Sequence, residues 1–271
     1  MRTARGFTLI ELIVVITLMG IVATLVAVPL LQPIKGFADT SRRVAMADAL
    51  DNALRRVGRE ARNVLPNSLR QPGANCIEFL PTLGGGRYRT NSASGDVLDF
   101  AAVDSSFDVV SSTGLGTLPS VARVVIYNLG IAGADAYALD NTASIQSLSG
   151  GKITLAAGKQ FPFESPGRRF HVIGDSAVVF ACIGASTAGG EGAGKLVRYT
   201  RALGTGLSAL SACPTSAPAG AVTVLDKVSS CAFYYTPGAL QRDGVLLMQV
   251  GLTQGGETAT LFHEAHVNNV P

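Results

Sequence analysis

The sequence predicts an α+β fold in which one long N-terminal helix precedes a mostly antiparallel β-rich head. Two observations support this class. An apolar run at residues 7–31 continues without a turn signal into an amphipathic stretch at residues 32–65. The remaining residues, 66–271, contain short β-type runs separated by glycine and proline turns. Because the helical stripe and one face of a sheet are both apolar, we expect the helix to pack on the sheet.

The overall composition narrows the function classes. The chain has 271 residues, of which 47% are hydrophobic and 15% charged, so it is able to bury a substantial core and is not a disordered protein. Its net charge of +3 is concentrated in residues 1–70, where Lys and Arg outnumber Asp and Glu. The larger C-terminal part has a slight acidic excess. The charge distribution therefore argues against a nucleic-acid partner.

The apolar run is long enough to cross a membrane. Residues from Leu12 to Leu31 carry no charge and would form a helix of roughly 30 Å, about the thickness of the bilayer core. Arg2 and Arg5 precede the run, so we expect a single-pass anchor with a cytoplasmic N-terminus and a translocated C-terminal part. No A-x-A cleavage pattern follows the run, which indicates that the anchor is retained.

A small residue, Gly6, separates the basic leader "MRTARG" from the apolar run. The stretch "GFTLIELIVVITLMG" that it opens resembles the N-terminus of type IV prepilins. The resemblance implies that a prepilin peptidase and N-methyltransferase removes the leader, residues 1–6, and methylates the new terminus at Phe7. It also implies that residues 7–31 form the assembly helix, and that Glu11 complements the free amino terminus of a neighbouring subunit in the filament core.

Electrostatics independently supports such a role for Glu11. A comparable acidic residue at the centre of a membrane helix costs about 2.5–3.5 kcal/mol, and less near the interface, where Glu11 would lie. Inside a filament of apolar helices the carboxylate needs a cation, and opposite charges about 4 Å apart gain roughly 4 kcal/mol at an effective dielectric near 20. We expect this pair to fix the axial register of the subunit. An incidental interfacial glutamate is the alternative.

The helix is expected to continue through residues 32–65 with one apolar stripe and an arginine-rich opposite face. Pro66 ends it. The arginine-rich face is either solvated or a subunit interface. The stripe consists of Val44, Ala47, Leu50, Leu54, Val57, Ala61 and Val64.

A continuous helix from Phe7 to Val64 would be about 87 Å long. Gly20, Pro29 and Pro33 are the positions where it is expected to loosen or kink. In type IV pilins the region between a glycine and a proline melts on assembly, so the resemblance implies this behaviour for residues 20–29. Here Pro29 falls one position beyond the usual place.

The head is expected to form one domain, because no internal repeat and no long linker divides it. Alternation is clearest near the C-terminus. The expected strands are residues 76–82, 96–103, 121–129, 152–156, 168–173, 177–183, 195–201, 228–238, 245–253 and 258–270.

Four cysteines, Cys76, Cys182, Cys213 and Cys231, all lie downstream of the anchor. In an oxidising compartment they are compatible with two disulfides in any of three pairings. We favour Cys213 with Cys231, which would close a short loop, and Cys76 with Cys182. Buried free thiols are the alternative. The absence of a C-x-x-C pair argues against a zinc ribbon.

Motifs associated with catalysis or cofactor binding are incomplete, so we expect no enzymatic activity, no cofactor and no metal. The stretch "GGEGAGKL" offers Leu196 where a P-loop needs Ser or Thr, and a strand-like segment follows it. His263 and His266 are three apart, which on a strand places them on opposite faces. No G-x-S-x-G motif accompanies the histidines. The aromatic stretch 233–238 could contact glycans, although sheet packing is the favoured interpretation.

Further phrases narrow the resemblance. "ALRRVGREARNVLPNSLR", "CIEFLPT", "GGRYR", "GDVLDF" and "HEAHVNNVP" are similar to MshO-type minor pilins of the mannose-sensitive haemagglutinin (MSHA) pilus. The resemblance implies a subunit that helps initiate or cap pilus assembly, and so adhesion, together with other major and minor pilins and an inner-membrane assembly platform. The subunit would lie in the inner membrane with a periplasmic head before assembly, and in the pilus after assembly. The alternatives are a GspJ-like minor pseudopilin of type II secretion and a membrane-tethered periplasmic adhesin.

Overall fold

A computed structural model describes residues 6–271, apart from 92, 94, 205, 208–209 and 239–242, and apart from the side chains of residues 27–35 and 38. Its one long helix, α1, spans Leu9–Arg62. The chain divides into two compact units, Met1–Met46 and Ala47–Pro271. We call the second the head unit, because it contains the predicted head together with the last turns of α1.

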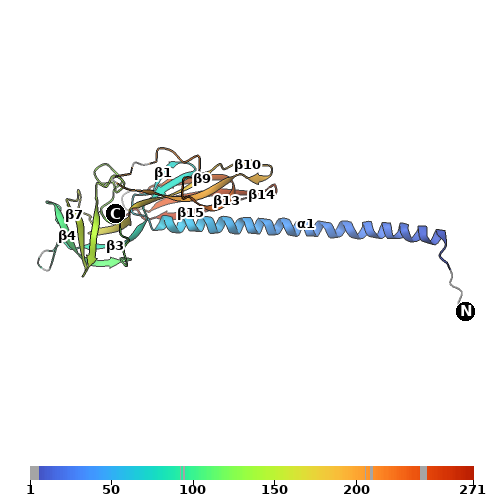
Figure 1. Cartoon of the computed structure of the whole chain (residues 1–271), viewed down its shortest axis with the longest axis horizontal. Helices are drawn as coiled ribbons and strands as arrows, with labels where there is room; N and C mark the ends of the chain where they lie inside the picture. Colours follow the sequence, from blue (N-terminus) through green and yellow to red (C-terminus); the bar gives the residue numbers. More distant parts are fainter. Residues whose placement is uncertain (1–5, 92, 94, 205, 208–209, 239–242) are drawn as a thin grey trace. The chain divides into compact units, whose positions relative to one another are not determined.

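The head unit contains a seven-stranded sheet in which every neighbouring pair is antiparallel. In Figure 1 its strands β13, β14 and β15 are drawn in orange and red. The sheet order is β1-β2-β9-β12-β13-β14-β15. The strands are β1 (Arg70–Gly73), β2 (Cys76–Phe79), β9 (Ser176–Ile183), β12 (Gly194–Ala202), β13 (Val222–Thr236), β14 (Gly244–Gln254) and β15 (Glu257–Val267).

A second group of strands closes into a six-stranded antiparallel barrel in the order β3-β4-β7-β6-β5-β8. Its interior is filled by apolar side chains, among which the Phe107 and Phe170 rings meet edge to face with centroids 5.8 Å apart. A short hairpin of β10 (Thr187–Ala188) and β11 (Glu191–Gly192) forms a separate two-stranded sheet, to which the backbone N–H of Gly256 donates a hydrogen bond of 2.8 Å at Gly190. The barrel strands are β3 (Thr82–Tyr88), β4 (Asp104–Thr113), β5 (Ala122–Ile126), β6 (Thr142–Ser149), β7 (Lys152–Lys159) and β8 (Arg169–Gly174).

The C-terminal part of α1 packs on the sheet through the predicted stripe. Leu50, Leu54 and Val57 are fully buried, whereas Val44, at the beginning of the stripe, is 56% exposed. The helix lies close to β15 at Gly58, where an added Cβ would lie 3.0 Å from Nε2 of His263. An apolar N-terminal helix followed by a mostly antiparallel β-sheet domain is the predicted α+β, pilin-like arrangement, and the fold class is confirmed.

The loop after α1 fastens the helix end to the barrel. Asn128 is buried, and its Nδ2 donates a hydrogen bond of 2.7 Å to the carbonyl oxygen of Pro66. Its Oδ1 accepts a hydrogen bond of 2.9 Å from the backbone N–H of Ala136. An apolar cluster that includes Leu65 and Val125 surrounds this junction. The polar groups of the loop are therefore satisfied within the protein, as buried groups require.

One predicted strand is wrong. Residues 96–103 form no strand, although Leu98 is buried. Two of their backbone N–H groups donate to side chains instead: that of Asp96 donates to the Asp108 carboxylate, and that of Asp99 to the Asp104 carboxylate. Aspartates that cap local N–H groups in this way compete with a strand ladder, and the apolar pattern alone does not reveal it.

Two disulfides form, but the favoured pairing is wrong: Cys76 bonds to Cys213 and Cys182 to Cys231. Cys76 on β2 lies directly opposite Ala181 on β9. Because successive strand residues point to opposite faces, Cys182 points away from Cys76, and the two thiols cannot meet. A short loop between two cysteines is therefore a weaker guide than the faces on which their strands place them.

Candidate processing and assembly site

The side chain of Thr8 caps the first helical turn. The backbone N–H of Glu11 donates a hydrogen bond of 3.3 Å to Oγ1 of Thr8, and α1 begins at the next residue, Leu9. The spacing Thr8-x-x-Glu11 is the T-x-x-E pattern that satisfies backbone donors at a helix start. Glu11 also places a carboxylate in the first turn, where the helix dipole favours negative charge. This capping role was readable in the sequence but went unrecognised there.

The predicted cleavage position lies ahead of the helix. Gly6, Phe7 and Thr8 belong to no regular secondary structure, and an added Cβ at Gly6 would have no neighbour within 4 Å. Phe7 is 82% exposed. The peptide bond between Gly6 and Phe7 is therefore accessible to a protease without unwinding α1.

The apolar segment Leu9–Val26 is long and apolar enough to cross a membrane, with a mean hydropathy of 2.7. None of it is buried within the described structure. The exposed fractions of its large apolar side chains run from 41% at Val15 to 76% at Leu9. An apolar surface of this extent is typical of a segment covered by lipid or by other protein chains.

Polar side chains inside this segment are satisfied within the helix, with one exception. Oγ1 of Thr17 donates to the carbonyl oxygens of Ile13 and Val14 at 3.0 and 2.9 Å, which makes the hydroxyl compatible with an apolar environment. Thr24 makes the same kind of contact with Gly20. Glu11, by contrast, has no cationic partner among the described residues.

The remaining predicted positions lie in different parts of the chain. Gly20 and Pro29 both fall inside α1, which is helical throughout Leu9–Arg62, so the kink stays a prediction about the assembled state. The four cysteines all lie in the head unit. The structure thus places Gly6 and Phe7 directly before α1 and Glu11 in its first turn, and the other predicted residues lie further along the chain.

The histidines and the glycine-rich segment, which were examined as metal-binding and nucleotide-binding motifs, belong to strands and turns of the head unit. His263 is half-buried on β15 and faces α1, whereas His266 is exposed, so the two histidines do lie on opposite faces. Within the described residues no group of three or more His, Cys, Asp or Glu side chains is placed to hold a metal ion. Gly189 and Gly190 form the turn of the β10–β11 hairpin, and the chain then enters β12. "GGEGAGKL" therefore does not lead into a helix, as a P-loop would.

The aromatic stretch 233–238 contributes mostly to β13. Tyr234 is 52% exposed, whereas the hydroxyl of Tyr235 accepts a hydrogen bond of 2.7 Å from Nδ2 of Asn269. Burial raises the pKa of Tyr235. The two tyrosines thus alternate as residues of a sheet do, which confirms the interpretation favoured for them.

Residues 1–27 match the prokaryotic N-terminal methylation motif. No curated protein and no solved structure matches the chain. The chain therefore carries a type IV pilin-like prepilin signal, which implies processing by a prepilin peptidase and assembly with other pilins. The motif points to a structural pilin, and together with the apolar helix it fits an inner-membrane-anchored pilin or pseudopilin.

Proposed function

We propose that this protein is a minor pilin of an MSHA-like type IV pilus, which helps initiate or cap the filament and so supports adhesion. One observation supports the proposal most strongly. The chain combines a methylation motif at residues 1–27 with an apolar helical segment, Leu9–Val26, and no part of the described structure covers this segment. Before assembly the bilayer would cover this segment. In a filament, the equivalent helices of neighbouring subunits would do so.

Maturation follows from the exposed position of Gly6 and Phe7. Hydrolysis of the peptide bond between them would release the leader, residues 1–6, and leave the amino group of Phe7 as the new terminus. An α-amino group has a pKa near 8, so it is largely protonated at neutral pH, and N-methylation leaves it a cation. The mature chain would then begin with a positive charge one helical turn before Glu11.

Assembly would place this cation and the Glu11 carboxylate of an adjacent subunit together. Leu9–Val26 holds no other charged residue, so Glu11 is the one carboxylate that the apolar segment offers to a neighbour. A charge buried without its partner is strongly unfavourable, so axial positions that leave the carboxylate unpaired are disfavoured. The pair would therefore select the axial register of the incoming subunit.

The size of the head unit supports a minor role. Ala47–Pro271 combines a seven-stranded sheet with a closed six-stranded barrel, which is bulky for the repeating subunit of a thin fibre. A single copy at a filament end meets fewer steric constraints. A GspJ-like pseudopilin of type II secretion would share these features, and a membrane-tethered adhesin would share the anchor but not polymerise.

Mass spectrometry of the N-terminal peptide, carried out separately on sheared surface filaments and on inner membranes, tests the proposal. We expect a peptide that begins with methylated Phe7 in the filament fraction. The same peptide confined to the inner membrane would favour a pseudopilin. A peptide that retains Met1 would contradict processing and leave the tethered adhesin as the better account.

A further inference from the structure

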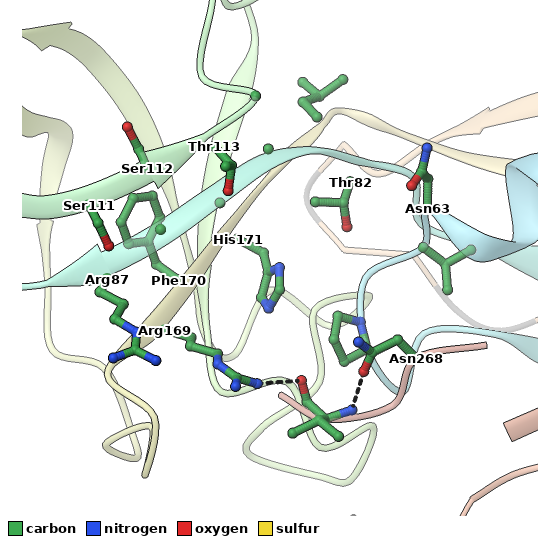
Figure 2. Close-up of a pocket in the computed structure, with 18 of the residues that line it drawn as sticks. Asn63, Thr82, Arg87, Ser111, Ser112, Thr113, Arg169, Phe170, His171 and Asn268 are labelled. Carbon is green, nitrogen blue, oxygen red and sulfur yellow. Dashed lines mark hydrogen bonds between the residues drawn. The ribbon is translucent and has the colours of Figure 1, made fainter. Parts of the chain in front are cut away.

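The head unit contains a cleft of about 620 Å³ that lies apart from the N-terminal segment. Barrel strands β3, β4 and β8 form one side of it, and residues 62–66 and 268–270 contribute the rest (Figure 2). Its volume falls within the range of small-molecule sites. The glycines of β3 leave this wall as bare backbone: a Cβ at Gly84 would lie only 2.8 Å from the backbone of Thr113 and Gly114.

All the charged side chains that line the cleft are positive. Three guanidinium groups line it, those of Arg62, Arg87 and Arg169, and no Asp or Glu is among the lining residues. Within the described part of the chain none of the three forms an ion pair with a carboxylate. Eight other arginines do form such pairs, for example Arg123 with Asp175 at 2.9 Å. Nη1 of Arg169 donates a hydrogen bond of 3.5 Å to the carbonyl oxygen of Val270 (Figure 2). The cleft thus gathers guanidinium groups that have no carboxylate of their own and can accept one, or a phosphate, from outside the chain.

Two shielded polar atoms on the wall also lack partners. Oγ1 of Thr82 and Nε2 of His171 are buried and accept or donate no hydrogen bond among the described residues. Figure 2 shows the His171 ring in the middle of the cleft, between Arg169 and Thr82. Burial, reinforced by the charge of Arg169, lowers the pKa of His171 to about 4, so the imidazole is neutral at pH 7. Buried polar groups without partners in a native protein often mark a place where a ligand supplies them.

Uncharged polar groups surround the guanidinium groups. Ser111, Ser112 and Thr113 present hydroxyls along β4, and Asn63 and Asn268 present amides from the opposite side (Figure 2). Hydroxyls and amides both donate and accept hydrogen bonds, which matches a ligand that carries several hydroxyl groups of its own. A ligand that combines hydroxyl groups with one negative charge would use both parts of the lining.

Other anionic ligands fit less well. The phenyl ring of Phe170 is completely buried, so the half-buried imidazole of His171 is the only other aromatic ring of the lining on which a nucleotide base could stack. Strand β3 is paired on one side with β4 and on the other with β8, so an extended acidic peptide finds no free strand edge there. We propose that this cleft binds an acidic sugar, whose carboxylate contacts the three arginines while its hydroxyls contact the polar rim.

The proposal is independent of filament assembly, because the cleft lies wholly within Ala47–Pro271. It is tested by saturation-transfer NMR and titration calorimetry of the full chain in detergent micelles at low ionic strength. D-glucuronate is the probe, D-glucose the neutral control and inorganic phosphate the simple anion. We expect binding of glucuronate, with glucose and phosphate each at least about tenfold weaker, because charge-assisted and hydroxyl contacts both contribute.

Arg62 and Arg59 provide a matched pair of variants, since both are exposed arginines in the last turns of α1 and only Arg62 lines the cleft. Arg62→Gln should weaken glucuronate binding about tenfold, and Arg59→Gln less than about twofold. Arg87→Gln, also exposed, repeats the test on β3. Equal affinity for glucuronate and glucose, equal affinity for glucuronate and phosphate, or equal losses in the Arg62 and Arg59 variants would each overturn the proposal.

A uronate-terminated tetrasaccharide identifies the source of the sugar. Tighter binding of the tetrasaccharide than of glucuronate would support the proposal and indicate a polysaccharide chain. Equal binding would also support it and indicate a single terminal or free sugar. A short peptide of Asp and Glu that binds more tightly than either sugar would contradict the proposal and favour an acidic protein partner.

Discussion

The two ends of α1 are one helix by backbone geometry, yet they differ in what covers them. In Leu9–Val26 the large apolar side chains face every direction and all are exposed. In the last turns the apolar side chains form one stripe, and Leu50, Leu54 and Val57 are buried by the sheet. The angular spread of apolar residues around a helix therefore indicates its environment. A single apolar stripe is covered by one protein face, whereas a helix that is apolar all round is covered by lipid or by several neighbouring helices.

The carboxylates of α1 follow the same division. Two of them pair within the chain in the last turns: Asp51 with Arg55 at 2.6 Å, and Glu60 with Arg198 of β12 at 2.9 Å. In the first turn Glu11 has no such partner among the described residues. The carboxylates of Asp51 and Glu60 are therefore paired within one subunit, and that of Glu11 is not.

The largest expected effect is that of Glu11→Ala on assembly. Loss of the carboxylate would remove a contact worth roughly 4 kcal/mol at an effective dielectric near 20, so incorporation into filaments should fall more than about tenfold. Membrane insertion should be unchanged, because the substitution makes the segment more apolar. The measurement is quantitative immunoblotting of sheared filaments against inner membranes.

Asp48→Ala is the matched control for this experiment, since it removes an exposed carboxylate from the same helix outside the apolar segment. Its incorporation should stay within about twofold of the unmodified protein, as expected of an exposed surface charge. Normal incorporation of the Glu11 variant would contradict the assembly role that we propose for this residue.

The next largest effect is expected from a Leu→Ala substitution, which can be made at both ends of α1. Leu54→Ala should destabilise the head unit by about 2–5 kcal/mol, because Leu54 is fully buried against the sheet and its removal leaves a cavity. Leu18→Ala, at a side chain that is 55% exposed, should leave head stability unchanged. Denaturant unfolding of the full chain in detergent measures both. Equal losses would show that the head also stabilises the apolar segment.

Features that depend on residues close together in the sequence were predicted best. Gly6, Phe7 and Glu11 lie within one short motif, and the stripe from Leu50 to Ala61 repeats at helical spacing, so local pattern sufficed for both. Strand β3 was missed because its three consecutive glycines resemble a loop, although they allow close approach to β4 and β8. Closure of the barrel depends on the pairing of β3 with β8, and no local pattern encodes it.

The cleft and the disulfides depended on distant residues. Arg62, Arg87 and Arg169 come from α1, β3 and β8, and nothing in their spacing indicates that they meet. Cys182 and Cys231 lie on β9 and β13, which both flank β12, so their contact depends on the strand order of the sheet. Such arrangements follow from strand order and register, which a single sequence specifies only through the complete fold.

A smaller effect is expected at Gly58, where α1 lies close to His263 of β15. Gly58→Leu should destabilise the head unit by about 1–3 kcal/mol, because the new side chain would overlap His263. His263→Ala in the same chain should restore part of this loss by making room. Thermal unfolding of the single and double variants measures the coupling. Strictly additive effects would contradict a direct contact between the two positions.

The smallest expected losses of stability concern ion pairs. They compare a pair that α1 makes with the sheet with a pair that lies within the helix. Glu60→Gln should cost about 1 kcal/mol, because both carboxylate oxygens lie within hydrogen-bonding distance of Arg198 Nε and both side chains are only 27% exposed. Asp51→Asn should cost about 0.3–0.5 kcal/mol, since its pair with Arg55 is solvated and lies along one helix. Denaturant unfolding at low and high salt measures both losses. If the Asp51 variant lost as much stability as the Glu60 variant, pairing with the sheet would contribute no more than pairing along the helix, and the buried stripe alone would hold the last turns of α1 on the sheet.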